Sequence, residues 1–128
     1  MYLGSFTLPN NVVVSGTVAA SAVLDIEVAG SEYNFNEVYI NPPTNVCTSN
    51  DTDANQAASI GFLGEHDDAG MSVEWATNHI VFGSSLLKPG TNQVMVCIRN
   101  VSGGAGSGVG NLDNITLRGA VLHYHTTP

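Results

Sequence analysis

Ser84-Ser85-Leu86-Leu87-Lys88-Pro89-Gly90-Thr91-Asn92-Gln93-Val94-Met95-Val96 is the most informative stretch of this sequence. At its centre, Pro89 fixes φ and Gly90 permits a positive φ, so these two residues predict a tight turn. A run of strand-forming residues, 93–99, follows the turn. The apolar side chains that the turn would deliver into a sandwich core are Val94, Val96 and Ile98. The stretch therefore predicts a turn that leads directly into a β-strand.

Further strand-like segments lie on both sides of this stretch, and turn residues separate them. Residues 24–28 alternate strictly between apolar and acidic side chains, which is typical of a strand with one buried face. Asn41-Pro42-Pro43 ends another segment, because proline cannot donate to a sheet ladder. The expected strands are 12–20, 24–28, 35–40, 59–63, 71–75, 80–82, 93–99 and 112–125. No window of helical length carries a 3.6-residue apolar period.

The last expected strand changes its apolar phase at Gly119. Ile115 and Leu117 are in phase with each other before the glycine, and Leu122 and Tyr124 follow in the other phase. A change of phase at a glycine predicts a β-bulge, in which one extra residue is inserted into a strand.

The length and the strand pattern together predict one domain. A chain of 128 residues is long enough to bury a hydrophobic core and too short for two ordinary domains. About eight strands separated by turns predict an all-β fold, a single antiparallel β-sandwich of the jelly-roll type over residues 1–128.

The composition is poor in charge, and most of the charge present is negative. Charged residues make up 11% of the chain, against about 25% in an ordinary globular domain. Three basic and eleven acidic residues give a net charge of −8. The basic residues are Lys88, Arg99 and Arg118. Three scattered cations cannot neutralise a run of phosphates, so we expect no nucleic-acid partner. Because the sequence has neither a polybasic cluster nor a long apolar run, we expect no membrane role.

Cys47 and Cys97 are the two cysteines of the chain, and their spacing fits no metal-binding or redox motif. Cys97 lies in a strand-like run, and Cys47 lies in a turn-rich segment. Two interpretations stay open at this point. The two residues form a disulfide, or they are two small buried hydrophobic side chains, which is a common role of free cysteine.

The opening stretch resembles the LLKPGTN turn and strand of galactose-binding-like jelly-roll domains, the fold of many carbohydrate-binding modules. Glu37-Val38-Tyr39-Ile40-Asn41 resembles the family's vYvNG strand and turn, with Pro42 in place of the usual glycine. Asn111-Leu112-Asp113-Asn114-Ile115-Thr116-Leu117 resembles its closing strand, so the resemblance covers residues 35–125. It implies a binding or docking scaffold that is usually non-catalytic, although the fold alone does not imply sugar binding.

Sugar-binding relatives of this family use exposed aromatic side chains, so the resemblance makes aromatic residues the candidate ligand-binding residues. The candidates are Tyr39, Trp75 and Tyr33. Trp75 is the only tryptophan, but its neighbours in register, Met71 and Val73, are apolar and favour burial. Tyr39 alternates with Glu37 on what reads as the polar face, so we expect it to be exposed. For both tyrosines the alternative is an ordinary surface position without a ligand.

Asp113 resembles the calcium-binding aspartate of the same family, so a structural calcium is the metal that the resemblance implies. Calcium takes six to eight oxygen ligands, and the family's N-terminal acidic partner has no clear counterpart here. The alternative is that Asp113 caps its turn through a side-chain hydrogen bond. We expect no required cofactor, and a structural calcium is the one ion that the resemblance allows.

Two other patterns are compatible with binding of a metal ion, but neither is specific for it. His123 and His125 stand two residues apart on one strand face, a spacing that can present two imidazoles to zinc, but no third ligand is evident. The acidic segment 65–68 predicts either a cation-binding loop or an ordinary solvated turn. No nucleophile elbow, zinc-protease motif or phosphate loop occurs, so we expect no enzyme.

Two functional hypotheses remain. The first is a structural protein of the virion surface, a decoration or cement protein that contacts other copies of itself or the major capsid protein. It accounts for the low charge, since under-solvated surface can be buried between subunits. It also accounts for residues 1–11, which lack a secretory signal. Either a signal has been removed, or the chain begins at Met1 and is not exported by that route, and we expect the second. The alternative is a carbohydrate-binding module of a secreted bacterial enzyme or lectin, with surface glycans as partners.

Overall fold

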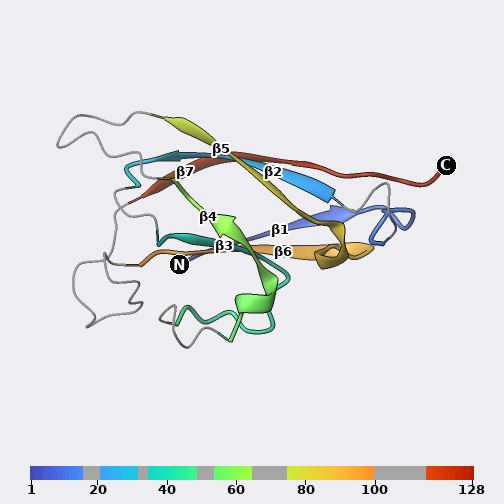
Figure 1. Cartoon of the computed structure of the whole chain (residues 1–128), viewed down its shortest axis with the longest axis horizontal. Coiled ribbons are helices and arrows are strands. Elements are labelled where there is room, and N and C mark those ends of the chain that lie inside the picture. Colours follow the sequence, from blue (N-terminus) through green and yellow to red (C-terminus); the bar gives the residue numbers. More distant parts are fainter. Residues whose placement is uncertain (16–20, 32–34, 49–53, 65–74, 100–114) are drawn as a thin grey trace.

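The computed structural model describes residues 1–15, 21–31, 35–48, 54–64, 75–99 and 115–128. Within these segments, seven strands form two antiparallel sheets that pack face to face, so the chain is an all-β sandwich (Figure 1). The strands are β1 (Tyr2–Leu8), β2 (Ser21–Ala29), β3 (Glu37–Ile40), β4 (Ser59–Phe62), β5 (Ala76–Gly83), β6 (Gly90–Cys97) and β7 (Thr116–His123). The larger sheet has the order β1-β6-β3-β4, and the smaller sheet has the order β5-β2-β7.

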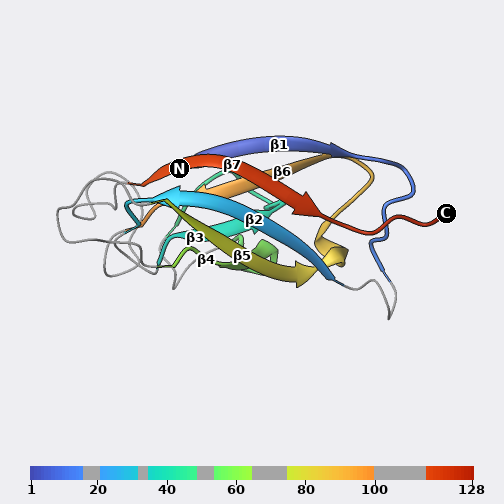
Figure 2. The same ribbon diagram turned by 90° about the horizontal axis from the view of Figure 1, so that it is seen from above.

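The chain passes from one sheet to the other at most of its connections, as it does in β-sandwiches of the Greek-key type. Seen from above, β1 and β7 run side by side along one edge of the sandwich, and β4 and β5 run along the opposite edge (Figure 2). The contact between β4 and β5 joins the two sheets at that second edge. The two edges of the sandwich are therefore built differently: β4 and β5 join the sheets at one edge, and β1 and β7 form the other.

The core lies between the two sheets, and β2 shows why. Leu24, Ile26 and Val28 are buried, whereas Asp25 and Glu27 between them are partly exposed on the outer face. This arrangement confirms the strand predicted from the alternation in 24–28. The larger sheet contributes Val38, Ile40 and Val96 from its inner face. Val94 packs against the same cluster, as the turn before it predicts.

The N-terminal region differs from the expectation. The structure places the first strand at β1, where no strand was predicted, and residues 12–15 of the expected strand 12–20 form no strand. Val12 makes only an isolated bridge to Thr126. In β1 the alternation is weak because Gly4 occupies an inward position and Leu3 an outward one, so the apolar pattern is blurred. Pairing with β6 compensates for this weak local pattern.

A network of buried asparagines fixes the turn before β6. Asn92 is fully buried, its Oδ1 accepts from the amide of Lys88 at 3.0 Å, and its Nδ2 donates to the carbonyl of Lys88 at 2.7 Å. Gly90 has a φ of 81°, which is the conformation that the turn prediction requires. Asn41, at the end of β3, donates to Asn92 Oδ1 at 2.8 Å. The turn is therefore held from inside the sheet as well as by its own backbone.

The structure confirms the β-bulge at Gly119. Ile26 pairs with Ala120 and Glu27 pairs with Arg118, so Gly119 has no partner residue on β2. Its φ of 60° lies in the left-handed region that favours glycine. The bulge lets apolar side chains on both sides of Gly119 face inward, which explains the change of phase in the sequence.

The described segments contain two single-turn 3₁₀ helices, η2 (Gln56–Ala58) and η3 (Ser84–Leu86), and no longer helix. No helix in this part of the chain is long and apolar enough to cross a membrane. The expected strand 71–75 and the first residues of the expected strand 112–125 lie largely outside the described residues. The expected strands at 59–63 and 80–82 correspond to β4 and to part of β5.

We expect Asn92→Ala to lower the free energy of unfolding by at least about 2 kcal/mol, because it removes a buried side-chain amide and leaves the part-buried backbone N–H of Lys88 and side-chain amide of Asn41 without this acceptor. Urea denaturation followed by tryptophan fluorescence measures this change. Thr91→Ala, at the exposed neighbouring position, is the matched control and should cost less than about 1 kcal/mol. Equal losses for the two variants would contradict the role assigned to the buried amide.

Candidate functional site

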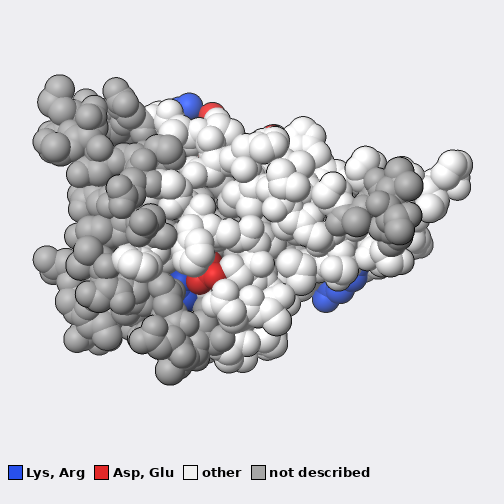
Figure 3. Space-filling model, viewed as in Figure 1, with Lys and Arg blue, Asp and Glu red and all other residues white. Residues whose placement is uncertain are grey.

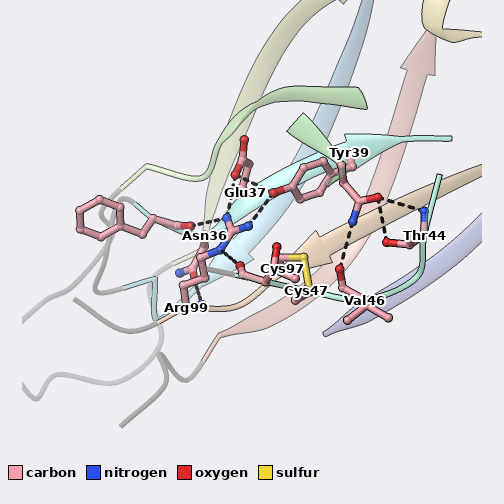
Figure 4. Close-up of a disulfide and its surroundings, with 11 residues drawn as sticks. Asn36, Glu37, Tyr39, Thr44, Val46, Cys47, Cys97 and Arg99 are labelled. Carbon is pink, nitrogen blue, oxygen red and sulfur yellow. Dashed lines mark hydrogen bonds and ion pairs between the residues drawn. A yellow bond between two sulfur atoms is a disulfide. The ribbon is translucent and has the colours of Figure 1, made fainter. Parts of the chain in front are cut away.

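The outer face of the larger sheet is covered by the chain that runs between β3 and β4. Tyr39, Met95 and Cys97 point to this outer face and are fully buried there with Ala58. Cys47, in the covering chain, forms a disulfide with Cys97 in the sheet (Figure 4), with the two Cα atoms 5.6 Å apart. The structure thus decides between the two interpretations of the cysteines in favour of the disulfide. The bridge closes a loop with a sequence separation of 50, for which chain entropy gives a stabilisation of about 4 kcal/mol.

A fully buried ion pair lies beside the disulfide. Nη1 of Arg99 donates to Oε2 of Glu37 at 2.7 Å, and both side chains have no exposed surface (Figure 4). The second carboxylate oxygen of Glu37 accepts from Ser59 and, at 3.4 Å, from Gln56. Burying two charges is costly unless hydrogen bonds satisfy their remaining polar atoms. Here the surrounding side chains satisfy the carboxylate on both oxygens.

The remaining donors of Arg99 are satisfied as well. Its Nη2 donates to the hydroxyl of Tyr39 at 2.6 Å, its Nε donates to the carbonyl of Thr48 at 3.1 Å, and its Nη1 also donates to the carbonyl of Phe35 at 3.3 Å. The side chain of Asn36 accepts from the backbone amide of Arg99 at 2.9 Å. The guanidinium therefore links β3, the covering chain and the end of β6.

This network corrects the expectation for Tyr39. We expected an exposed tyrosine on the polar face, but its ring is fully buried and its hydroxyl donates to Glu37 at 2.6 Å. The alternation between Tyr39 and Glu37 was real, but the covering chain turns that polar face into an interior. A buried ring cannot stack on a sugar, so Tyr39 is not available as a ligand-binding residue.

The charge of Arg99 is stable in this environment. Burial alone lowers the pKa of the guanidinium, but the hydrogen bonds that it donates to Tyr39 and Glu37 outweigh burial and raise the pKa above its ordinary value. Because neither side chain of the pair has exposed surface, we assign the pair a structural role in holding β3, β6 and the covering chain together. Sequence reasoning missed this pair, although Arg99 stood out as one of three basic residues.

Trp75, the second candidate, is partly buried at the start of β5, and its ring packs against a cation. The guanidinium carbon of Arg118 lies 4.1 Å from the centroid of the indole ring. Nε of Arg118 also donates to Glu27 at 3.1 Å, and both of these side chains are largely exposed. Such a stack stabilises the pair by about 0.5–1 kcal/mol at an exposed site. Arg118 therefore covers one face of the indole.

A second polar cluster lies on the exposed outer face of the smaller sheet. One oxygen of Asp25 on β2 accepts from Nδ1 of His79 on β5 at 2.6 Å, and the other accepts from Nε2 of His123 on β7 at 2.9 Å. The cluster thus crosses all three strands. The pairing of His123 with His125 considered from the sequence is not what the structure shows, since His123 contacts a residue of the neighbouring strand. Strand pairing, which the sequence alone does not give, creates this cluster.

These hydrogen bonds affect the acidity of Asp25. The hydrogen bond from His79 is the largest effect and lowers the pKa of the carboxyl, partial desolvation opposes it, and His123 lowers the pKa further. The net pKa lies below its ordinary value of 3.8. In the part of the chain that the structure describes, no group of three or more His, Cys, Asp or Glu side chains is arranged to hold a metal ion. The residues Tyr33, Asp113 and 65–68 fall outside that part.

The edge at β1 and β7 holds an apolar groove of about 360 Å³. It lies between the two sheets and is lined mainly by core side chains: Phe6, Leu24, Ile26, Val94, Leu117 and Leu122. At one end the chain after β1 closes the edge, because the amide of Val13 donates to the carbonyl of His125 at 2.8 Å and the amide of Thr127 donates to that of Asn11 at 2.9 Å. Beyond these two hydrogen bonds, the groove is open to solvent at the side of the sandwich.

The surface around the groove carries little charge and several large apolar side chains. Tyr2 and Leu3, on β1, are 47% and 41% exposed. Figure 3 shows the opposite side, which carries β4 and β5, and there too charged groups are visible at only a few places among the described residues. Because Arg99 is buried, the exposed basic residues are Lys88 and Arg118. A groove with such a rim is the candidate functional site, since exposed apolar patches mark interaction surfaces.

Comparison with known proteins adds no relative to this description: no protein-family model, no curated protein and no solved structure matches the chain.

We expect Glu37→Gln to lower the free energy of unfolding by about 3–5 kcal/mol, because it leaves the charge of Arg99 buried without its counter-ion. The matched control is Glu27→Gln, which breaks the exposed pair with Arg118 and should cost less than about 1 kcal/mol. Chemical denaturation of both variants at pH 7 gives the comparison. A cost for Glu37→Gln no larger than that of the control would show that the buried pair is dispensable.

The lowered pKa of Asp25 predicts a pH-dependent contribution to stability. A carboxyl whose pKa is lower in the folded chain stabilises the fold above its unfolded pKa, and this stabilisation is lost as the pH falls through the folded value. We therefore expect the stability difference between wild type and Asp25→Asn to be constant above about pH 5 and to shrink below pH 3.8. Thermal unfolding at a series of pH values measures it. Ser21→Ala, on the same strand, should show a difference independent of pH.

Proposed function

We propose that this chain is a non-catalytic structural protein that docks on other protein subunits, and specifically a decoration or cement protein on the surface of a phage capsid. The observation that carries the proposal is the apolar groove at the edge of β1 and β7, with Tyr2 and Leu3 exposed beside it. A monomer that stayed alone in water would leave this surface unfavourably hydrated. Burial against another protein removes that cost.

The charge distribution supports a protein partner. The groove is lined by one charged residue, Arg118, and that residue is already paired with Glu27. Interfaces between proteins are depleted of charged residues at their centre. Many small contacts of this kind add by multivalency when copies of a protein bind around the symmetry axes of a shell. The role needs no cofactor, and we place the protein at the virion surface.

We also propose that the sandwich is a jelly roll of the galactose-binding-like type. The turn before β6 supports this, since η3 leads into a Pro89-Gly90 turn that Asn92 closes, as the resemblance of this stretch implies. The end of β3 supports it as well, because Asn41, which matches the asparagine of the family's strand and turn, has a positive φ of 51°. A structural calcium at Asp113 remains part of this proposal.

A second candidate function, sugar binding in a carbohydrate-binding module, rests on Trp75. With Tyr39 buried, Trp75 is the described candidate that stays partly exposed, and its ring already stacks on Arg118. Aromatic faces with an adjacent hydrogen-bonding group are suited to pyranose rings. One face of the indole is covered in this way, so the groove favours the docking role over this one.

The test is the protein composition of particles purified from the cells that carry this gene. We expect the chain to co-sediment with the shell at a fixed ratio to the major capsid protein. Deletion of the gene should lower the temperature at which the particles release their genome. Particles that never contain the chain would overturn the proposal.

A glycan array separates the second candidate from the first. Binding to a defined glycan that is lost in Trp75→Ala and retained in Phe62→Ala would establish the sugar-binding role. Phe62 is a matched control because it is an exposed aromatic residue in the other sheet, on β4, whereas Trp75 directly precedes β5 of the smaller sheet.

A further inference from the structure

We propose that the free edge of β1 docks a second copy of this chain, and that the two β1 strands pair antiparallel across a two-fold axis at Ser5. This inference rests on the docking role proposed for the same edge and deepens it, because it names the partner that the edge binds. It commits the edge to one occupant, a second copy, and it fixes the register of the pairing.

β1 is an unprotected edge strand. All seven of its residues pair with β6 on one side, with no shift of register, and no described strand pairs with it on the other side. Natural edge strands are usually protected by charged side chains, proline, bulges or very short length. β1 contains no charged residue and no proline. Its backbone groups are thus available to another strand.

The other three edges of the described sheets do carry such protection. On β7, Arg118 and His123 are charged or ionisable, and Gly119 forms a bulge. β4 has four residues, and its pairing with β3 changes register. β5 carries His79 in the middle of its outer face. Among the described edges, β1 alone combines length and regular register with the absence of both charged side chains and histidine.

The edge of β1 carries little charge in a chain that is strongly acidic overall. With a net charge of −8, two copies repel each other over most approaches. At β1 no charged side chain meets the second copy, and the adjacent groove is lined by one charged residue, Arg118, which Glu27 already neutralises. The edge of β1 is therefore a place where two copies can approach without opposing like charges. Added salt should strengthen the association, because it screens the remaining repulsion.

Two-fold symmetry restricts the register in which β1 can pair with β1 of a second copy. Residues directly opposite in an antiparallel pair point to the same face, so a two-fold axis normal to the sheet must pass through a residue paired with itself. An axis at Ser5, the middle residue of β1, pairs all seven residues of both strands. It places Gly4 opposite Phe6 of the second copy, and the same pair recurs on the other side of the axis.

This register matches a small residue with a large one. Gly4 and Phe6 both line the groove, and Phe6 packs against the core. A Cβ on Gly4 would lie 3.2 Å from the hydroxyl of Tyr2 and 3.4 Å from Val94, so the space there is closely limited. Because the ring and hydroxyl of Tyr2 already lie over Gly4, the Phe6 ring of the second copy would pack on Tyr2 beside the glycine and close part of the groove. Pairing of a seven-residue edge is a small interface, so we expect a dissociation constant on the order of micromolar.

The experiment measures the mass of the full chain by light scattering behind a sizing column, over a series of loading concentrations. We expect the mass to rise from 13.3 kDa toward twice that value. Ser5→Lys places two like charges opposite each other at the axis and should raise the dissociation constant at least about tenfold. Thr77→Lys is the matched control, because Thr77 is also exposed on an edge strand, and it should leave dimerisation unchanged.

A wild-type mass that stays at 13.3 kDa up to millimolar loading would overturn the inference. Dimerisation of Ser5→Lys at wild-type affinity would overturn it as well, since the copies would then use another surface. Circular dichroism and thermal unfolding confirm that the variants are folded. Ser5→Cys gives a second readout: under oxidation it should form a disulfide-linked dimer, whereas Thr77→Cys should not. Neither result decides the proposed function, which depends on the particle experiment.

Discussion

The buried ion pair between Glu37 and Arg99 is the interaction on which the larger sheet and its covering chain depend. Neither charge contacts water, so each remaining polar atom around them must have a partner inside the protein. Tyr39, Ser59 and the carbonyl of Thr48 take these positions, and their placement fixes the path of the chain over the sheet. The disulfide ties the same chain covalently, so β3 and β6 become interior strands with both faces covered.

The chain between β3 and β4 makes the two edges of the sandwich different from each other. The chain beyond β3 protects the outer face of the larger sheet, and β4 meets β5 at one edge of the sandwich. At the other edge, β1 and β7 leave core side chains accessible and carry almost no charge. The rigid, cross-linked region and the open apolar edge are therefore spatially separate. A scaffold of this kind can bind through its edge without disturbing the network that holds it together.

The sequence predicts the elements whose signal is local, and it misses those that arise from pairing. The alternation in 24–28, the turn at Pro89 and Gly90 and the bulge at Gly119 all follow from the chain itself. The exposure predicted for Tyr39 was wrong because the covering chain is contributed by residues after β3. Asp25 and His79 meet only once β2 and β5 pair, and the weak alternation of β1 becomes a strand only against β6.

The strand order has a consequence for how the protein folds. β1 has its one described partner in β6, which follows more than eighty residues later, and β2 is flanked by β5 and β7. Neither sheet can close by local contacts, so the chain must search for long-range pairings, and folding is slow in topologies of this kind. During synthesis the N-terminal strands emerge long before their partners. The nascent chain therefore carries the unprotected β1 segment unpaired until β6 has left the ribosome, a period in which a chaperone or a neighbouring nascent chain can reach it.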